Sequence, residues 1–153
     1  MTTKTDLTKF YELVEKFKDD IIYILKTIHK EDEVKRINIH YDKLLMGKKI
    51  SARRIVEYVY HKGIEPCARH ILTKNEEFFL GHVDKVDTGE HIEERDVMLI
   101  NHVAVMWPFL DVNIKNNIWK YIQILSILSE KISGGNVLSK MRDELVAEGI
   151  KLT

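Results

Sequence analysis

The chain has 153 residues, a mass of 18.0 kDa and a formal net charge of zero, with 24 basic and 24 acidic side chains. This length predicts one domain over residues 1–153 that can bury its own core, and the single cysteine excludes an internal disulfide framework. The balanced charge favours neither a histone-like protein nor an acidic tail, and no apolar stretch is long enough to cross a membrane.

The first third of the chain predicts helices from its apolar spacing. Residues 7–28 carry apolar side chains at steps of three and four, with Asp6 as the expected cap. A second helix is predicted from Asp32 to Met46, and Gly47 is expected to end it.

A third helix is predicted to begin at Ser51 and stop at Gly63, because Pro66 follows and cannot continue it. The pattern Thr73-Lys-Asn-Glu76 is typical of a capping box and predicts a short helix before a loop that runs to about residue 90. The spacing predicts a further helix ending at Trp107, where Pro108 follows, and a last one from Asn136 to Glu148.

The helix predicted at about 113–133 is the most apolar in the chain. Asp111 or Asn113 is expected to cap it, and glycines at 134 and 135 to end it. Trp119, Ile124 and Ile127 widen its apolar face almost all round, and such a helix is normally buried. We therefore predict an all-α, compact single-domain bundle of six or seven helices around this buried central helix.

One segment of the chain carries a family resemblance. It reads Trp107-Pro-Phe-Leu-Asp111 and then Asn117-Ile-Trp-Lys-Tyr-Ile-Gln123, within residues 98–131. It resembles an uncharacterised family of small helical proteins of nucleocytoplasmic large DNA viruses (giant viruses), in which the position of Ile122 is Leu. The resemblance implies a helical viral protein packaged in virions and implies no catalytic residue.

Four aromatic residues, Phe78, Phe79, Trp119 and Tyr121, are candidate anchors for a protein partner, because exposed aromatic side chains dominate many interfaces. For Trp119 and Tyr121 the alternative is a place in the core and at its edge, and the sequence favours it because aromatic rings supply much of core burial.

The charge is distributed unevenly along the chain. Residues 42–74 hold eight lysines and arginines against three carboxylates, a net of +5, and residues 76–96 have a net of −6. Within the segment 43–74, Lys48, Lys49, Arg53 and Arg54 surround a predicted helix start and could contact phosphate. The alternative is ordinary solvated charge, which we favour.

The sequence gives little support to metal or acid–base chemistry. Cys67 and His70 form only half of a zinc motif, and the other histidines lack the spacing of a zinc helix. The carboxylates in Glu93-Glu94-Arg95-Asp96 are explained by a helix start. We therefore expect no cofactor and no metal.

We expect a non-enzymatic viral accessory or virion-associated protein that binds another protein or itself, as a homodimer. The alternatives are a nucleic-acid-binding module that uses the segment 43–74 and, more weakly, an enzyme with a dispersed site. The expected location is the virion or the cytoplasm of the infected cell, because the first residues have no apolar signal region.

Overall fold

The computed structural model describes residues 4–80 and 100–152, and these residues form helices and turns with no strand. The predicted all-α fold class is confirmed. The elements are α1 (Asp6–Thr27), α2 (Glu31–Val59), η1 (Tyr60–Ile64), η2 (Glu65–Cys67), α3 (Ala68–Leu72), α4 (Glu76–Leu80), α6 (Ile100–Met106), η3 (Trp107–Phe109), α7 (Val112–Ser133) and α8 (Val137–Ala147).

Helix α1 forms where the apolar spacing predicts it, with one correction at its start. Its cap is Thr5, whose hydroxyl accepts a hydrogen bond from the amide of Thr8 at 3.2 Å, whereas Asp6 is already the first helical residue. A carboxylate in the first turn still interacts favourably with the helix dipole. The apolar face is buried through the whole helix: Phe10, Tyr11, Val14, Phe17, Ile21 and Leu25.

Helix α2 differs from the prediction at two helix boundaries, Gly47 and Ser51. It runs through Gly47, which does not end it, and continues to Val59. The break falls at Ser51, whose backbone (φ −155°, ψ 62°) leaves the helical region, so the predicted start of a new helix there is a kink. Core residues on both sides of the kink, such as Leu44 and Val56, bury the two arms against the rest of the protein. Packing therefore outweighs the helix propensity of one glycine.

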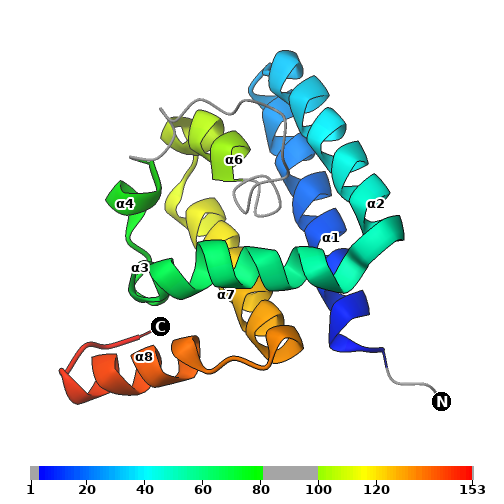
Figure 1. Cartoon of the computed structure of the whole chain (residues 1–153). Helices are drawn as coiled ribbons and strands as arrows, with labels where there is room; N and C mark the ends of the chain where they lie inside the picture. Colours follow the sequence, from blue (N-terminus) through cyan, green and yellow to red (C-terminus); the bar gives the residue numbers. More distant parts are fainter. Residues whose placement is uncertain (1–3, 81–99, 153) are drawn as a thin grey trace.

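The chain also stays helical through Gly63 and Pro66, contrary to the predicted stop. Gly63 lies in a π-helical turn, η1, and Pro66 in the 3₁₀ turn η2, which leads into α3. Proline is tolerated in a first turn because its missing amide would have no helical partner there. Figure 1 shows the second arm of α2 and these turns as one continuous path across α7.

The short helix α4 begins after Asn75, whose side-chain oxygen accepts from the amide of Phe78 at 3.1 Å. Asn75 therefore caps this helix, and not Thr73. Helix α6 ends at Met106, and Pro108 follows in the 3₁₀ turn η3, as predicted.

Helix α7 packs on α1 and α2 and also contacts η1, α3 and α8. Asp111 caps it by accepting from the amide of Ile114 at 2.9 Å, and Gly134 ends it with φ +70°. One part of the prediction is wrong, because Ile124 and Ile127 are exposed and α7 is therefore not buried all round. Helix α8 follows after Gly134 and Gly135 and packs on α3 through the buried Leu138 and Leu145.

Candidate functional site

The aromatic residues predicted as interaction anchors are engaged inside the fold. Trp119 is only 6% exposed, and its ring meets those of Trp107 and Phe79 edge-on, with centroids 6.4 and 5.4 Å apart. Phe79 is half-buried, and Phe78 stacks on the imidazole of His70 at 3.7 Å. These contacts hold α4 and η3 against α7, and they place Trp119 in the core, as the favoured interpretation of the sequence expects.

Tyr121 joins α7 to α1. Its ring stacks on Phe17 with centroids 4.6 Å apart, and its hydroxyl donates a hydrogen bond to the carboxylate of Asp20. Burial, followed by the nearby Asp20 carboxylate, raises the pKa of the Tyr121 hydroxyl above its ordinary value. Both effects disfavour the phenolate, so Tyr121 acts here as a neutral hydrogen-bond donor.

The four predicted phosphate-contacting residues are exposed on α2, but two of them have clear partners. Lys48 lies over the ring of Tyr11, 4.8 Å from its centroid. Arg53 donates to Glu57 at 3.0 Å and to the main-chain oxygen of Ile132 at 2.7 Å. Arg53 thus binds the C-terminal end of α7, where carbonyl groups lack helical partners.

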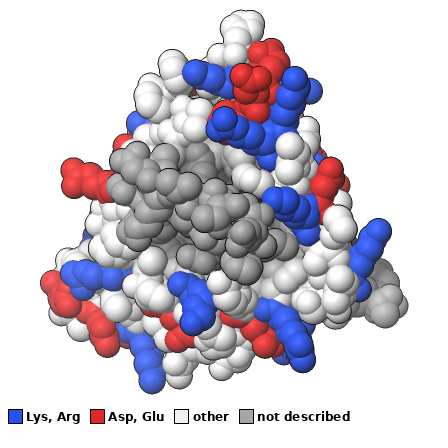
Figure 2. Space-filling view, turned by 45° about the horizontal axis from the view of Figure 1, so that its top comes forward, with Lys and Arg blue, Asp and Glu red and all other residues white. Residues whose placement is uncertain are grey.

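Lysines and arginines do not gather on the face shown in Figure 2; they alternate with acidic side chains over it. The described residues include no group of three or more histidine, cysteine or acidic side chains able to hold a metal ion. The helix start predicted at Glu93–Asp96, and two of the histidines considered as metal ligands, His82 and His91, lie outside the described residues.

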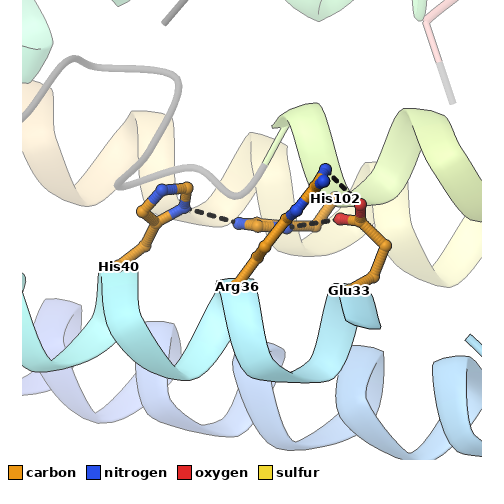
Figure 3. A network of polar contacts seen from close by, with 4 residues as sticks. All are labelled: Glu33, Arg36, His40 and His102. Atoms are coloured by element: carbon orange, nitrogen blue, oxygen red, sulfur yellow. Dashed lines mark hydrogen bonds and ion pairs between the residues drawn. The ribbon is translucent and has the colours of Figure 1, made fainter. Parts of the chain in front are cut away.

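A buried polar network that the sequence did not predict joins α2 and α6 (Figure 3). His102 is 2% exposed, and its Nδ1 lies 3.2 Å from a carboxylate oxygen of Glu33. Its Nε2 lies 2.9 Å from Nδ1 of His40. Arg36 completes the network by donating to the other oxygen of Glu33 at 2.8 Å.

In this network the carboxylate orients the central imidazole, and the two facing ring nitrogens share one proton. Burial is the largest influence on His102 and lowers its pKa; Glu33 opposes this, while the charges of His40 and Arg36 add to it. A neutral His102 therefore links the two helices by hydrogen bonds. The spacing of Glu33, Arg36 and His40 puts them on one helix face, but nothing in the sequence pairs them with a residue 62 positions away.

A second buried polar residue, Glu130, was also missed. It is 6% exposed, accepts from the Tyr60 hydroxyl at 2.6 Å and from the amide of Leu138 at 2.7 Å, and also contacts Ser139. The amides belong to the first turn of α8, so this carboxylate caps that helix from a distance. The role of Glu130 is structural, because its carboxylate is occupied by these donors.

The surface of α2 shows the feature that packing does not explain. Ile39, Met46 and Ile50 are 56, 67 and 86% exposed, and we call these three residues the α2 stripe. At 3.6 residues per turn they share one face, opposite the core face of the same helix, which carries Val34, Ile37 and Leu44. Helix α2 lies at the outer edge of the fold beside α1, so this face points away from the bundle (Figure 1).

Comparison with known proteins finds no match to this chain among family models, curated proteins or solved structures. Among the helices that the structure describes, none has the length and apolar character needed to span a membrane.

Proposed function

We propose that this chain is a non-enzymatic protein that works by binding another protein, and that the α2 stripe is its binding surface. The supporting observation is the exposure of Ile39, Met46 and Ile50 on one side of one helix. Single exposed apolar side chains are ordinary on protein surfaces, but an aligned row of them is typical of a helix face that packs on a partner.

We also propose that the protein serves a giant virus, as a virion component or an accessory factor in the infected cell. The support for this part is the resemblance of residues 98–131 alone. Within that segment Trp107 and Trp119 are buried and their rings meet edge-on, so these two residues of the motif belong to the core.

The two alternative functions stay predictions, and the described residues favour neither. Lys48 and Arg53 have intramolecular partners, which weakens a nucleic-acid surface at that site. The network of Glu33, His102 and His40 contains acid–base groups that an enzyme could use, but its central imidazole is buried, which favours a structural role.

The test is affinity purification of the tagged chain from infected cells, with nuclease treatment before elution. Wild-type protein is expected to retain specific proteins after nuclease treatment. A variant with Ile39→Ser, Met46→Ser and Ile50→Ser should lose them, because serine removes the apolar contact area without disturbing the core face.

The matched control is a variant with Val112→Ser and Val146→Ser, two apolar residues of similar exposure elsewhere on the surface. It should retain the same proteins as the wild type. Equal recovery by the stripe variant and the wild type would refute this binding surface, and recovery that disappears with nuclease would favour nucleic acid instead.

A further inference from the structure

The spacing of the α2 stripe points to one particular partner. Lys43 lies between Ile39 and Met46 on the same face, so the four positions 39, 43, 46 and 50 follow steps of four, three and four residues. These are the alternating steps of the a and d positions of a heptad, the pattern by which one helix packs along another. The sequence of steps is the same when it is read from either end.

We propose that the partner is a second copy of this chain, and that two α2 helices pack antiparallel through their stripes about a two-fold axis; the proposal rests on the binding function proposed above. In this arrangement Ile39 lies opposite the partner's Ile50, and Lys43 lies opposite the partner's Met46. Because the spacing is symmetric, each pair forms twice, which is the condition for an isologous interface.

The length of α2 before its kink fits this arrangement. The first arm of α2, from residue 31 to the kink at Ser51, is about 30 Å long at 1.5 Å per residue, and the stripe occupies its second half up to the kink. The kink turns the following arm away, so the antiparallel overlap is confined to the exposed segment. A lysine stem can cover apolar area while its ammonium group reaches water, so Lys43 fits beside the partner's Met46.

One flank of the stripe carries complementary charges. Asp42 and Lys49 are both exposed and lie beside the stripe on the same side of the helix. The antiparallel register brings Asp42 next to the partner's Lys49, and the two-fold axis repeats that pair. A parallel pairing would instead place this flank beside the opposite flank of the partner, so the two Asp42–Lys49 pairs would not form.

The opposite flank is already used within the chain. Glu33 and His40 point from that side of α2 toward His102 on α6 (Figure 3). These contacts fix the rotation of α2 about its axis, so the stripe is presented outward. The network therefore orients the proposed interface without taking part in it.

The direction of pairing can be tested by disulfide cross-linking in a Cys67→Ala background, because Cys67 is the only native cysteine. Ile39→Cys and Ile50→Cys are made in separate proteins and mixed in a glutathione redox buffer. The antiparallel arrangement predicts a covalent dimer in the mixture that joins one protein of each kind, and little in either protein alone. Self-linked dimers of each variant would overturn it.

The charge pairs are tested by reversal. Asp42→Lys and Lys49→Asp should each weaken self-association about tenfold, since each breaks two symmetric pairs and creates repulsion. The double variant should recover affinity to within about threefold of the wild type. Failure of the double variant to recover would contradict the proposed register. The substituted positions are exposed on the surface, and an unchanged thermal unfolding temperature for each variant would show that its fold is intact.

The outcomes separate this inference from the proposed function. If cross-linking fails while the serine variant of the stripe still loses its captured proteins, self-pairing is wrong and the binding function stands. If cross-linking fails and capture is also unaffected, both are wrong.

Discussion

At the scale of single residues, the stability of the fold depends on the hydrogen bonds that the buried carboxylate of Glu130 accepts. It receives hydrogen bonds from the Tyr60 hydroxyl and from amides in the first turn of α8. Glu130→Ala should lower the free energy of unfolding by about 3 kcal/mol, because these donors would be left without an acceptor. Chemical denaturation measures the change.

Two matched variants separate the acceptor from its donors. Tyr60→Phe removes the hydrogen bond to Glu130 and the longer one from the amide of Val137, and it should cost about 1 kcal/mol. Glu130→Gln keeps one acceptor oxygen and should fall between the two. A stable Glu130→Ala protein would show that water replaces the carboxylate at this position.

Gly135 is fixed by a close approach to the same tyrosine. A Cβ at this position would lie 2.2 Å from the Tyr60 hydroxyl oxygen. Gly135→Ala should therefore cost about 2 kcal/mol or more, because the tyrosine must leave its hydrogen bond with Glu130.

Its neighbour provides the control. A Cβ on Gly134 would meet nothing within 4 Å, but φ is +70°, so Gly134→Ala adds only backbone strain of about 1 kcal/mol. Thermal unfolding of the two variants should rank Gly135→Ala as the less stable, and the reverse order would contradict the close contact.

The lowered pKa of His102 should make the stability of the fold depend on pH. Burial lowers its pKa below the ordinary value of 6.5, so the unfolded chain takes up a proton at a higher pH than the folded chain does. The free energy of unfolding should therefore fall as the pH drops below about 6.5, and His102 should contribute nothing to the slope above it. Denaturant unfolding at about pH 7.5 and about pH 5 measures this difference.

The control for the pH effect is His102→Gln, which cannot take up a proton. Its stability should change less between the two pH values than that of the wild type. Equal slopes in both proteins would show that His102 does not cause the pH dependence.

At the scale of elements, the start of α7 depends on one cap. Asp111→Ala should cost about 1 kcal/mol, because the amide of Ile114 loses its acceptor. Asn113→Ala is the matched control, since Asn113 is exposed inside the helix and alanine favours the helical state there. Circular dichroism during thermal unfolding compares them, and equal losses would argue against the cap.

The sequence predicts these helices well where apolar spacing and a cap coincide. Asp111, Gly134 and Pro108 are placed correctly, because local backbone chemistry decides them. Gly47, Gly63 and Pro66 are predicted as stops but lie inside helical segments, because residues on both sides are held by tertiary packing. A single sequence contains no measure of that packing.

The same limit applies to the candidate sites. Sequence spacing places Trp119 in the core, but it also predicts burial for Ile124 and Ile127, which are exposed. The contact of His40 with His102, and of Glu130 with Tyr60, joins residues more than 60 positions apart, and only the fold brings them together. The α2 stripe was likewise not predicted, because its exposure depends on which side of α2 meets α1.

At the scale of the whole molecule, most large apolar residues form the core, and a smaller set lies exposed on the surface. Helices α1, α7 and the core face of α2 close one interior, whereas the α2 stripe remains on the outside. The polar network with His102 holds α2 in the orientation that presents the stripe. We therefore propose that the outer face of α2 is a protein-binding surface that pairs with a second copy.

The most direct test of this claim is the mass of the full chain in solution, measured by sedimentation equilibrium over about a hundredfold range of concentration. The average mass of the wild-type protein should rise with concentration from 18.0 kDa toward twice that value. The average mass of the variant with serine at positions 39, 46 and 50 should stay at that of one chain. The same mass for both proteins at every concentration would contradict the account.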